Sequence, residues 1–255
     1  MNTATVAFRQ LRYEQKVFRR TPAALFFTLA FPLLLLVIFG TLNRNEHIPL
    51  LGGVRFTQYY VPSMAAFGLM TSCFASLAGR FVYRREAGLL KRVRATPLPV
   101  GVLIGSFVAN AVLMGVLVTA LNISVGVALY GVALPDRWPA FVLVVLVGSA
   151  SFCALGVAIS TVVPNLEATD PMIFGLFMPI VFISGAFFPV PPSSILSRIA
   201  TVFPVRHLIQ ASFAVFDVRQ GGSGLRLGDL AIVALWGLAG AVFAARRFRW
   251  EPTRR

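Results

Sequence analysis

The feature that most constrains this fold is a series of six apolar runs, each long enough to cross a lipid bilayer as a helix. About 20 residues at a rise of 1.5 Å per residue span a hydrocarbon core of ~30 Å. Only 13% of the 255 residues are charged, whereas about a quarter of the residues in a soluble domain are charged. We therefore predict an all-α integral membrane protein, a single transmembrane domain over residues 1–255, with six transmembrane helices at about 23–42, 59–79, 100–128, 139–163, 171–189 and 227–245.

Basic residues are distributed unevenly among the segments outside these runs. Residues 1–22, 80–99 and 246–255 together hold 16 of the 23 Lys and Arg residues, and the other connections share the remaining 7. Lys and Arg in short loops stay on the cytoplasmic side, so we expect both termini in the cytoplasm, a parity that six spans satisfy. The net charge of +14 is then a topology signal. We expect no nucleic-acid partner, because the chain has no soluble basic domain.

The first 22 residues combine basic and apolar side chains at helical spacing. Apolar residues recur at intervals of about three and four between Val6 and Phe18, which is typical of a helix lying in the membrane interface. We therefore predict an N-terminal amphipathic interfacial helix over residues 1–22. The alternative is a solvated basic tail that only anchors topology. The polar face of the helix would carry Arg9, Arg12, Lys16, Arg19 and Arg20.

The connection at residues 80–99 has six Lys and Arg residues and also features that topology does not require. Glu86, its lone acid, can accept a hydrogen bond from an Arg of its own helix or of a partner. Gly88 permits a tight turn, and Pro97 and Pro99 end a helix. We predict a cytoplasmic coupling helix between spans two and three; the alternative is a basic loop. Its small apolar face would consist of Leu89, Leu90 and Val93.

The connection at residues 190–226 holds two short apolar faces separated by Pro204. Neither face is long enough to cross the membrane, and such lengths suit re-entrant or interfacial helices. We predict an external re-entrant helical hairpin that packs among the spans, with a loosely structured external loop as the alternative.

Several kinds of chemistry lack their sequence motifs. The chain has no GK[ST] of a P-loop, no HExxH and no GxSxG, so we expect neither an ATP site nor a catalytic or metal centre. The first five apolar runs contain no Asp, Glu, Lys, Arg or His, whereas a proton-driven carrier needs a titratable group along its path. We infer that the chain is not an enzyme and that a partner at the cytoplasmic face delivers the driving force.

Two segments resemble ABC-2-type exporter permeases. Residues 84–98, RREAGLLKRVRATPL, are similar to the segment that follows the second span in this family. Residues 179–189, PIVFISGAFFP, with the later Phe203-Pro204-Val205, are similar to its fifth span and the hairpin after it. The opening RRTP at residues 19–22 is similar to the drug-exporter branch, which the daunorubicin permease typifies. The resemblance covers nearly the whole chain.

The resemblance implies partners and a cellular location. Two six-span permease subunits, identical or paralogous, would pair in the bacterial cytoplasmic membrane, and each would dock on one of two ABC ATPase subunits. ATP and Mg would bind to those ATPase subunits, and this chain would bind no cofactor. The cargo would be hydrophobic or amphiphilic: drugs, lipids or polyketide-like compounds. The alternatives are a permease for lipid-linked glycans, a membrane scaffold that transports nothing, and an intramembrane hydrolase.

The resemblance also assigns residues. The contact with the ATPase falls within residues 84–96, on Arg84, Arg85, Glu86, Gly88, Leu89, Leu90, Arg92 and Thr96. The fifth span and the hairpin would cap the translocation path. Apolar surface attracts amphiphiles with little polar specificity, so the phenylalanines of spans one and five are the expected path, although lipid contact or packing is the alternative for any single one. The substrate-path residues are Phe27, Phe31, Phe177, Phe182, Ser184, Phe187 and Phe188.

Overall fold

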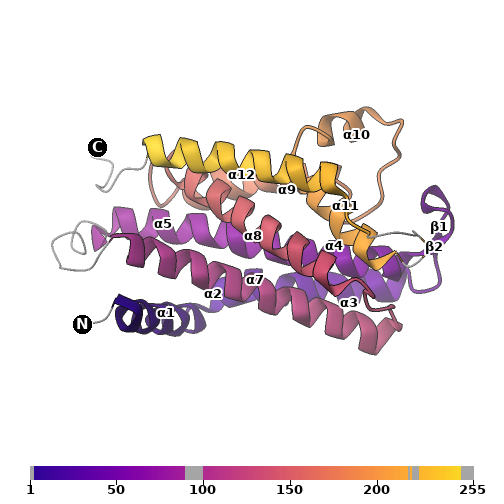
Figure 1. The fold of residues 1–255 in the computed structure, drawn as a ribbon, viewed down its shortest axis with the longest axis horizontal. Coiled ribbons are helices and arrows are strands. Elements are labelled where there is room, and N and C mark those ends of the chain that lie inside the picture. Colours follow the sequence, from indigo (N-terminus) through magenta and orange to yellow (C-terminus); the bar gives the residue numbers. More distant parts are fainter. Residues whose placement is uncertain (1–2, 90–99, 218, 220–223, 248–255) are drawn as a thin grey trace.

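A long central helix organises the molecule. The computed structural model describes residues 3–89, 100–217, 219 and 224–247. In it α4 (Phe56–Met70), the π-helical segment η3 (Thr71–Ser76) and α5 (Leu77–Glu86) form one continuous helix of 31 residues. Its most apolar window is 94% buried, because helices cover it on several sides (Figure 1). A helix that is apolar all round suits such a central position.

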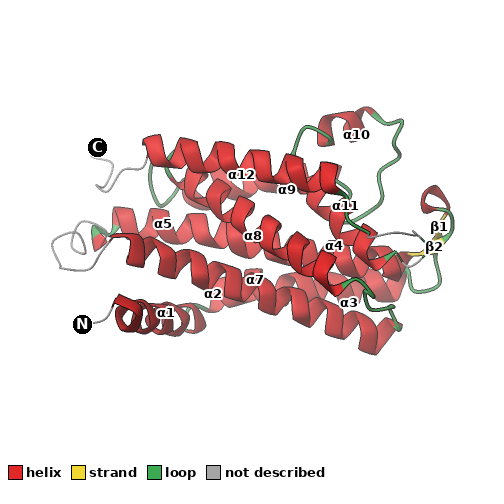
Figure 2. Ribbon diagram, viewed as in Figure 1, coloured by secondary structure: helices red, strands yellow, loops and turns green. Residues whose placement is uncertain are grey.

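Within the described residues, three further helices are long and apolar enough to cross a membrane. They are α7 (Val100–Tyr130), α8 (Trp138–Ser160) and α12 (Leu227–Arg247). The prediction of an all-α class is confirmed at the level of a helical membrane protein, since uninterrupted apolar length was its basis. Figure 2 shows how completely helix dominates the fold.

Two more apolar helices in the described residues are shorter than a membrane span. The first comprises the π-helical segment η1 (Phe26–Ala30) and α3 (Phe31–Leu42), and α2 (Pro22–Leu25) precedes it. The second is α9 (Thr169–Ile183), which starts two residues before the predicted span 171–189 and ends six residues before its end. The chain turns at residues 184–188 instead of continuing the helix. The count of six spans therefore stays a prediction.

The predicted external hairpin contains two helices of different burial. α10 (Ile195–Ala200) lies apart from the bundle (Figure 1) and exposes most of its apolar side chains. α11 (Pro204–Phe216) is buried along almost its whole length. Its Leu208 reaches Gly148, near the middle of α8, where a carbon added to Gly148 would lie 2.8 Å from Leu208 Cδ1. α11 therefore packs inside the bundle.

Besides α10, one further helix and a small hairpin lie outside the bundle of apolar helices in the described residues. The helix is α1 (Thr3–Arg19), which falls within the predicted interfacial helix at 1–22. The hairpin consists of two short strands, β1 (His47–Ile48) and β2 (Val54–Arg55), which pair antiparallel with His47 opposite Arg55. They enclose a 3-10 turn, η2 (Pro49–Leu51). The all-α prediction did not include this small hairpin.

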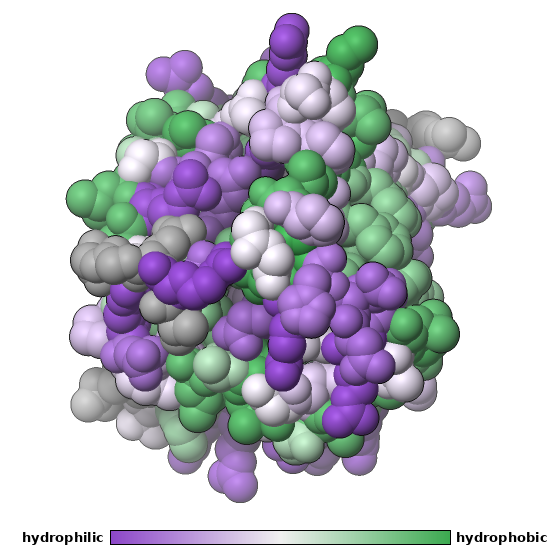
Figure 3. All heavy atoms as spheres, turned by 90° about the vertical axis from the view of Figure 1, so that its right-hand side faces the viewer, coloured by the Kyte–Doolittle hydropathy of each residue, from purple (hydrophilic) through white to green (hydrophobic). Residues whose placement is uncertain are grey.

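The two ends of the bundle differ in charge. One end, which we call the basic end, gathers α1, the end of α5 and the end of α12 (Figure 1, left). The opposite end carries β1, β2 and the end of α11. Figure 3 looks onto the opposite end, where hydrophilic side chains crowd the middle of the face and hydrophobic ones lie mainly toward its edges.

Candidate functional site

The helix that contains predicted span two continues past Arg80, the predicted start of the basic connection, and ends at Glu86. Arg80, Arg84 and Arg85 therefore belong to the helix of span two and do not begin a separate coupling helix. Each finds a partner on a neighbouring element, and these partners allow charged residues to stay inside a helix at the bundle end.

Arg84 attaches α1 to the central helix. Its guanidinium donates to Glu14 Oε2 at 2.7 Å, and the Glu14 side chain is fully buried. The same guanidinium lies over the Phe107 ring of α7, 4.4 Å from its centroid. Arg80 adds a second contact with α1, since its guanidinium lies 5.0 Å from the centroid of Phe18. α1 is thus held by buried ionic and cation–π contacts, while its four basic residues Arg9, Arg12, Lys16 and Arg19 are exposed, as is Arg20 just after it.

Arg85 caps the end of α8. Its two terminal nitrogens donate to the carbonyl oxygens of Ser160, at 2.8 Å, and Val163, at 2.5 Å. The last carbonyls of a helix have no partner within the helix and carry its negative dipole end, so a cation there is favourable. Arg85 Nε also donates to Glu86 at 2.7 Å. Glu86 is therefore paired within its own helix, which is one of the two arrangements that the sequence left open.

Gly88 turns the chain away from the end of α5. Its φ of +68° is left-handed, and its N–H donates to the Arg85 carbonyl at 3.0 Å. Glycine adopts this conformation without the steric penalty of a side chain. Leu89 follows, about one-third exposed. The other residues assigned to the ATPase contact lie outside the described residues: Leu90, Arg92 and Thr96.

Glu14 is the acid that the sequence analysis did not single out, and its environment has a pH-dependent consequence. Burial raises the pKa of the Glu14 carboxyl above 4.5, and the Arg84 charge and its hydrogen bond lower it only in part. The folded protein therefore holds the Glu14 proton more tightly than the unfolded chain does. The stability that this proton confers is fully present below pH 4.5 and is lost as the pH rises through the raised pKa.

We expect Glu14→Gln, which stays neutral, to abolish this pH dependence. As the pH rises from 4.5 toward 7, the thermal unfolding midpoint of the wild type should fall relative to that of the variant. The measurement is thermal unfolding of the purified protein in neutral detergent across this range. Glu14→Ala is the control, because it leaves Arg84 without any acceptor and should destabilise at every pH. A pH-independent difference between wild type and Glu14→Gln would contradict the prediction.

A row of aromatic rings, in two groups of contacting rings, lies along α3, the central helix and α9. Phe67 of α4 is at its centre: its ring stacks on Phe177 at 6.2 Å between centroids and meets Phe187 at 5.5 Å and Phe31 at 6.4 Å. We call this row the aromatic stripe; its members are Phe26, Phe27, Phe31, Phe39, Phe56, Tyr60, Phe67, Phe74, Phe174, Phe177, Phe182, Phe187 and Phe188.

The ring contacts form two groups: one around Phe67 includes Phe27, and the other joins Phe39, Phe56, Tyr60 and Phe188. Phe27, at the start of span one, contacts Phe174 of α9, and Phe188 closes the other end against Phe39 and Phe56. Of the predicted path residues, Phe177 and Phe187 are buried, whereas Phe27, Phe182 and Phe188 are about half exposed. Sequence analysis selected these phenylalanines but missed Phe56, Tyr60, Phe67 and Phe74 of the central helix, which connect them.

Ser184 lies in the turn after α9, beside the stripe. It is buried, and its hydroxyl has no hydrogen-bond partner within the described ranges. The next residue is held from the central helix, since the Tyr59 hydroxyl donates to the Gly185 carbonyl at 2.6 Å. The hydrogen bond to Gly185 therefore holds the turn with Ser184, a predicted path residue, against α4.

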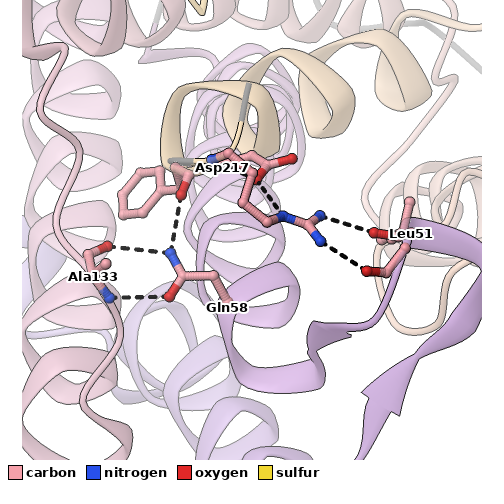
Figure 4. Close-up of polar contacts among 7 residues, drawn as sticks. Leu51, Gln58, Ala133 and Asp217 are labelled. Carbon is pink, nitrogen blue, oxygen red and sulfur yellow. Dashed lines mark hydrogen bonds and ion pairs between the residues drawn. The ribbon is translucent and has the colours of Figure 1, made fainter. Parts of the chain in front are cut away.

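Polar contacts join the loops at the opposite end (Figure 4). Gln58 of α4 donates to the carbonyl oxygens of Phe216 and Ala133 and accepts from the Ala133 N–H. Arg219 donates to the carbonyls of Leu51 and Gly52 in the turn between β1 and β2. The start of the central helix, the loop before α8 and the end of α11 are thus tied together.

A second ionic cluster fixes α11 to α12. His207 Nδ1 lies 2.6 Å from Asp229 Oδ1, and its Nε2 lies 2.8 Å from the Thr201 carbonyl oxygen. Arg226 pairs with the other oxygen of Asp229 at 3.0 Å. The carboxylate of Asp229 is therefore fully engaged. No group of three His, Cys, Asp or Glu side chains in the described part of the chain is arranged to hold a metal ion.

Comparison with known proteins gives a family. No curated protein matches the chain. A family model described as ABC-2 type transporter matches residues 7–216, from α1 to the end of α11. Members of that family are membrane permeases that work with an ATPase. With its apolar helices, buried central helix and basic end, this chain belongs to the ABC-2 type transporter family as a multi-pass permease.

Proposed function

We propose that this permease is the membrane subunit of an ATP-driven exporter that moves hydrophobic or amphiphilic compounds, such as drugs or lipids, out of a bacterial cell. Two permease subunits, identical or paralogous, form the transporter with two ATPase subunits. Each permease crosses the cytoplasmic membrane six times and has both termini inside. The basic end is then the cytoplasmic end, where Lys and Arg residues are retained.

The observation that carries the proposal is the aromatic stripe. It offers apolar surface along the length of the bundle, with half-exposed rings at Phe27 near the basic end and at Phe182 and Phe188 toward the opposite end. Rings of this kind bind apolar bodies of varied shape by burial and edge-to-face contact. A compound that enters along span one would meet the ring of Phe27, and one that reaches the turn after α9 would meet Phe182 and Phe188.

The basic end supports coupling to an ATPase. Arg84 links the central helix to α1, and Arg85 links it to the end of α8. A displacement of α1 or of the turn at Gly88 by a partner is therefore passed to the helix that carries Phe67. In the proposed mechanism, ATP binding closes the ATPase pair, moves these cytoplasmic attachments and shifts Phe67 against Phe177 of α9, which changes the access to the stripe.

Transport into inside-out membrane vesicles tests the function. The permease is co-expressed with its ATPase, and uptake of an NBD-labelled phospholipid and of a lipophilic fluorescent dye is followed with and without ATP. We expect ATP-dependent uptake of at least one probe and co-purification of the ATPase with the permease. Uptake that ignores ATP, or a permease that purifies without any ATPase, contradicts the proposal.

Phe182→Ala tests the role of the stripe within this assay. Phe182 is 59% exposed, so its truncation removes ring contacts for a substrate without opening a cavity in the core. We expect ATP-dependent uptake to fall about fivefold, the value of one aromatic contact. Leu146→Ala is the matched control, because Leu146 is 57% exposed on α8 and lies outside the stripe. Equal effects of the two substitutions would contradict a role for Phe182 in the path.

A further inference from the structure

Arg206, the third residue of α11, is a buried cation for which the described residues supply no partner. Only 9% of the residue is exposed. In the described part of the chain no hydrogen bond or ion pair engages its guanidinium, and its Nε is enclosed. Arginine keeps its charge in proteins, and a buried charge is stable only when it is paired. An acceptor that is not part of this chain therefore has a place here.

The nearby acids are already engaged. Asp229 holds His207 with one oxygen and Arg226 with the other. Asp217 pairs with Arg219 beyond the far end of α11. By contrast, the cations Arg44 and Arg198 at this end of the molecule are exposed and solvated. Arg206 thus differs from these arginines: it is buried, and the described residues supply no acceptor for its guanidinium.

The face of α11 that carries Arg206 packs against the start of the central helix. Arg206 and Phe213 are seven residues apart, so they lie on the same face of α11. The Phe213 ring meets the ring of Tyr59 at 5.1 Å between centroids. Tyr59 holds the Gly185 carbonyl, so this face of α11 looks toward the turn that contains Ser184, whose own hydroxyl has no partner in the ranges that the structure describes.

We propose that Arg206 binds the anionic head group of an amphiphile, a phosphate or a carboxylate, while the aromatic stripe takes its apolar chain. A guanidinium suits this role because its planar fork donates two parallel hydrogen bonds to such a group. The Ser184 hydroxyl, which has no hydrogen-bond partner among the described residues, lies in the turn that Tyr59 holds and would be a neutral donor. This inference rests on the proposed function only for the direction in which the amphiphile travels; binding itself needs neither ATP nor an ATPase.

The experiment is a binding titration of the full-length permease in nanodiscs of neutral phosphatidylcholine. The probes are dodecyl phosphate and its uncharged counterpart dodecanol, and binding to empty nanodiscs is subtracted. We expect the wild type to bind dodecyl phosphate about tenfold more tightly than dodecanol, as a charge-assisted hydrogen bond predicts. Arg206→Gln should remove this preference, and Arg206→Lys should keep part of it, because lysine retains the charge but not the fork. Arg198→Gln, on the exposed helix α10, should leave it unchanged.

A second arm distinguishes the source of the anion. When phosphatidylglycerol replaces part of the phosphatidylcholine, weaker binding of dodecyl phosphate to the wild type identifies a site open to membrane head groups. Unchanged binding identifies a site that receives only compounds in the path, and both outcomes support an anion site. Equal affinity of the wild type for the two probes overturns the proposal. The proposal is also overturned if Arg206→Gln still prefers dodecyl phosphate to dodecanol, or if the only effect of this substitution is a loss of thermal stability. Because no ATP is used, a failure of ATP-driven transport leaves this result standing.

Discussion

Replacement of Arg85 with methionine is expected to lower the stability of the purified permease by about 3–5 kcal/mol, the effect of removing one partner from a buried ionic network. The substitution leaves the Ser160 and Val163 carbonyls and the Glu86 carboxylate without their donor. Each buried acceptor that loses its hydrogen bond costs about 1–3 kcal/mol. Methionine has a similar volume, so the loss reports on polar contacts and not on a cavity.

The measurement is thermal unfolding in detergent, together with ATP-dependent uptake in vesicles. Arg85→Lys should be intermediate, because an ammonium group cannot reach both carbonyls and Glu86 in the geometry of a guanidinium. Arg246→Met, at the exposed end of α12, should change stability by less than about 0.5 kcal/mol. A wild-type unfolding midpoint for Arg85→Met would show that α8 does not depend on this cap.

Gly156→Leu is expected to separate α8 from the central helix and to destabilise the protein by about 3 kcal/mol. A carbon added to Gly156 would lie 2.7 Å from the Cys73 carbonyl oxygen and 2.8 Å from that of Phe74. Both are backbone atoms of η3, which cannot move aside as the tip of a side chain can. Glycine is required here because the two helices touch backbone to backbone.

Gly175→Leu on α9 is the matched control for this prediction. Nothing lies within 4 Å of a carbon added to Gly175, and leucine forms helix better than glycine, so the unfolding midpoint should stay the same or rise slightly. Thermal unfolding of both variants in the same detergent decides the matter. Equal destabilisation at the two positions would mean that helix composition, and not the contact at η3, governs the loss.

Hydropathy predicted the long helices well because length and apolar composition are local properties. The run at 100–128 corresponds to α7 (Val100–Tyr130), and the run at 227–245 to α12 (Leu227–Arg247). The same reasoning placed the end of span two before Arg80, since it treats any charge as a boundary. The helix continues to Glu86 because α1 and α8 supply partners for its arginines, and such tertiary contacts have no local sequence signal.

The candidate site shows the same division. The sequence allowed the phenylalanines of spans one and five to be chosen as a group. Phe67 is one of 23 phenylalanines, and only the packing shows that its ring contacts Phe31 and Phe177. Glu14 had a weak signal, as a lone acid within a basic amphipathic helix, and its role depends on Arg84, 70 residues away. The strands β1 and β2 have two residues each. Two residues are too few to show the alternation of apolar and polar side chains that predicts a strand.

The π-helical segment η3 sets the phase of the central helix. An α-helix turns about 100° per residue, and a π turn closes its hydrogen bond over one residue more than an α turn does. The surplus residue within Thr71–Ser76 therefore rotates the half that contains Arg84 and Arg85 by about one residue relative to the half that contains Phe67. The length of η3 therefore sets the direction of Arg85 relative to that of Phe67. A one-residue deletion in η3 would leave both halves helical but would turn Arg85 away from the end of α8.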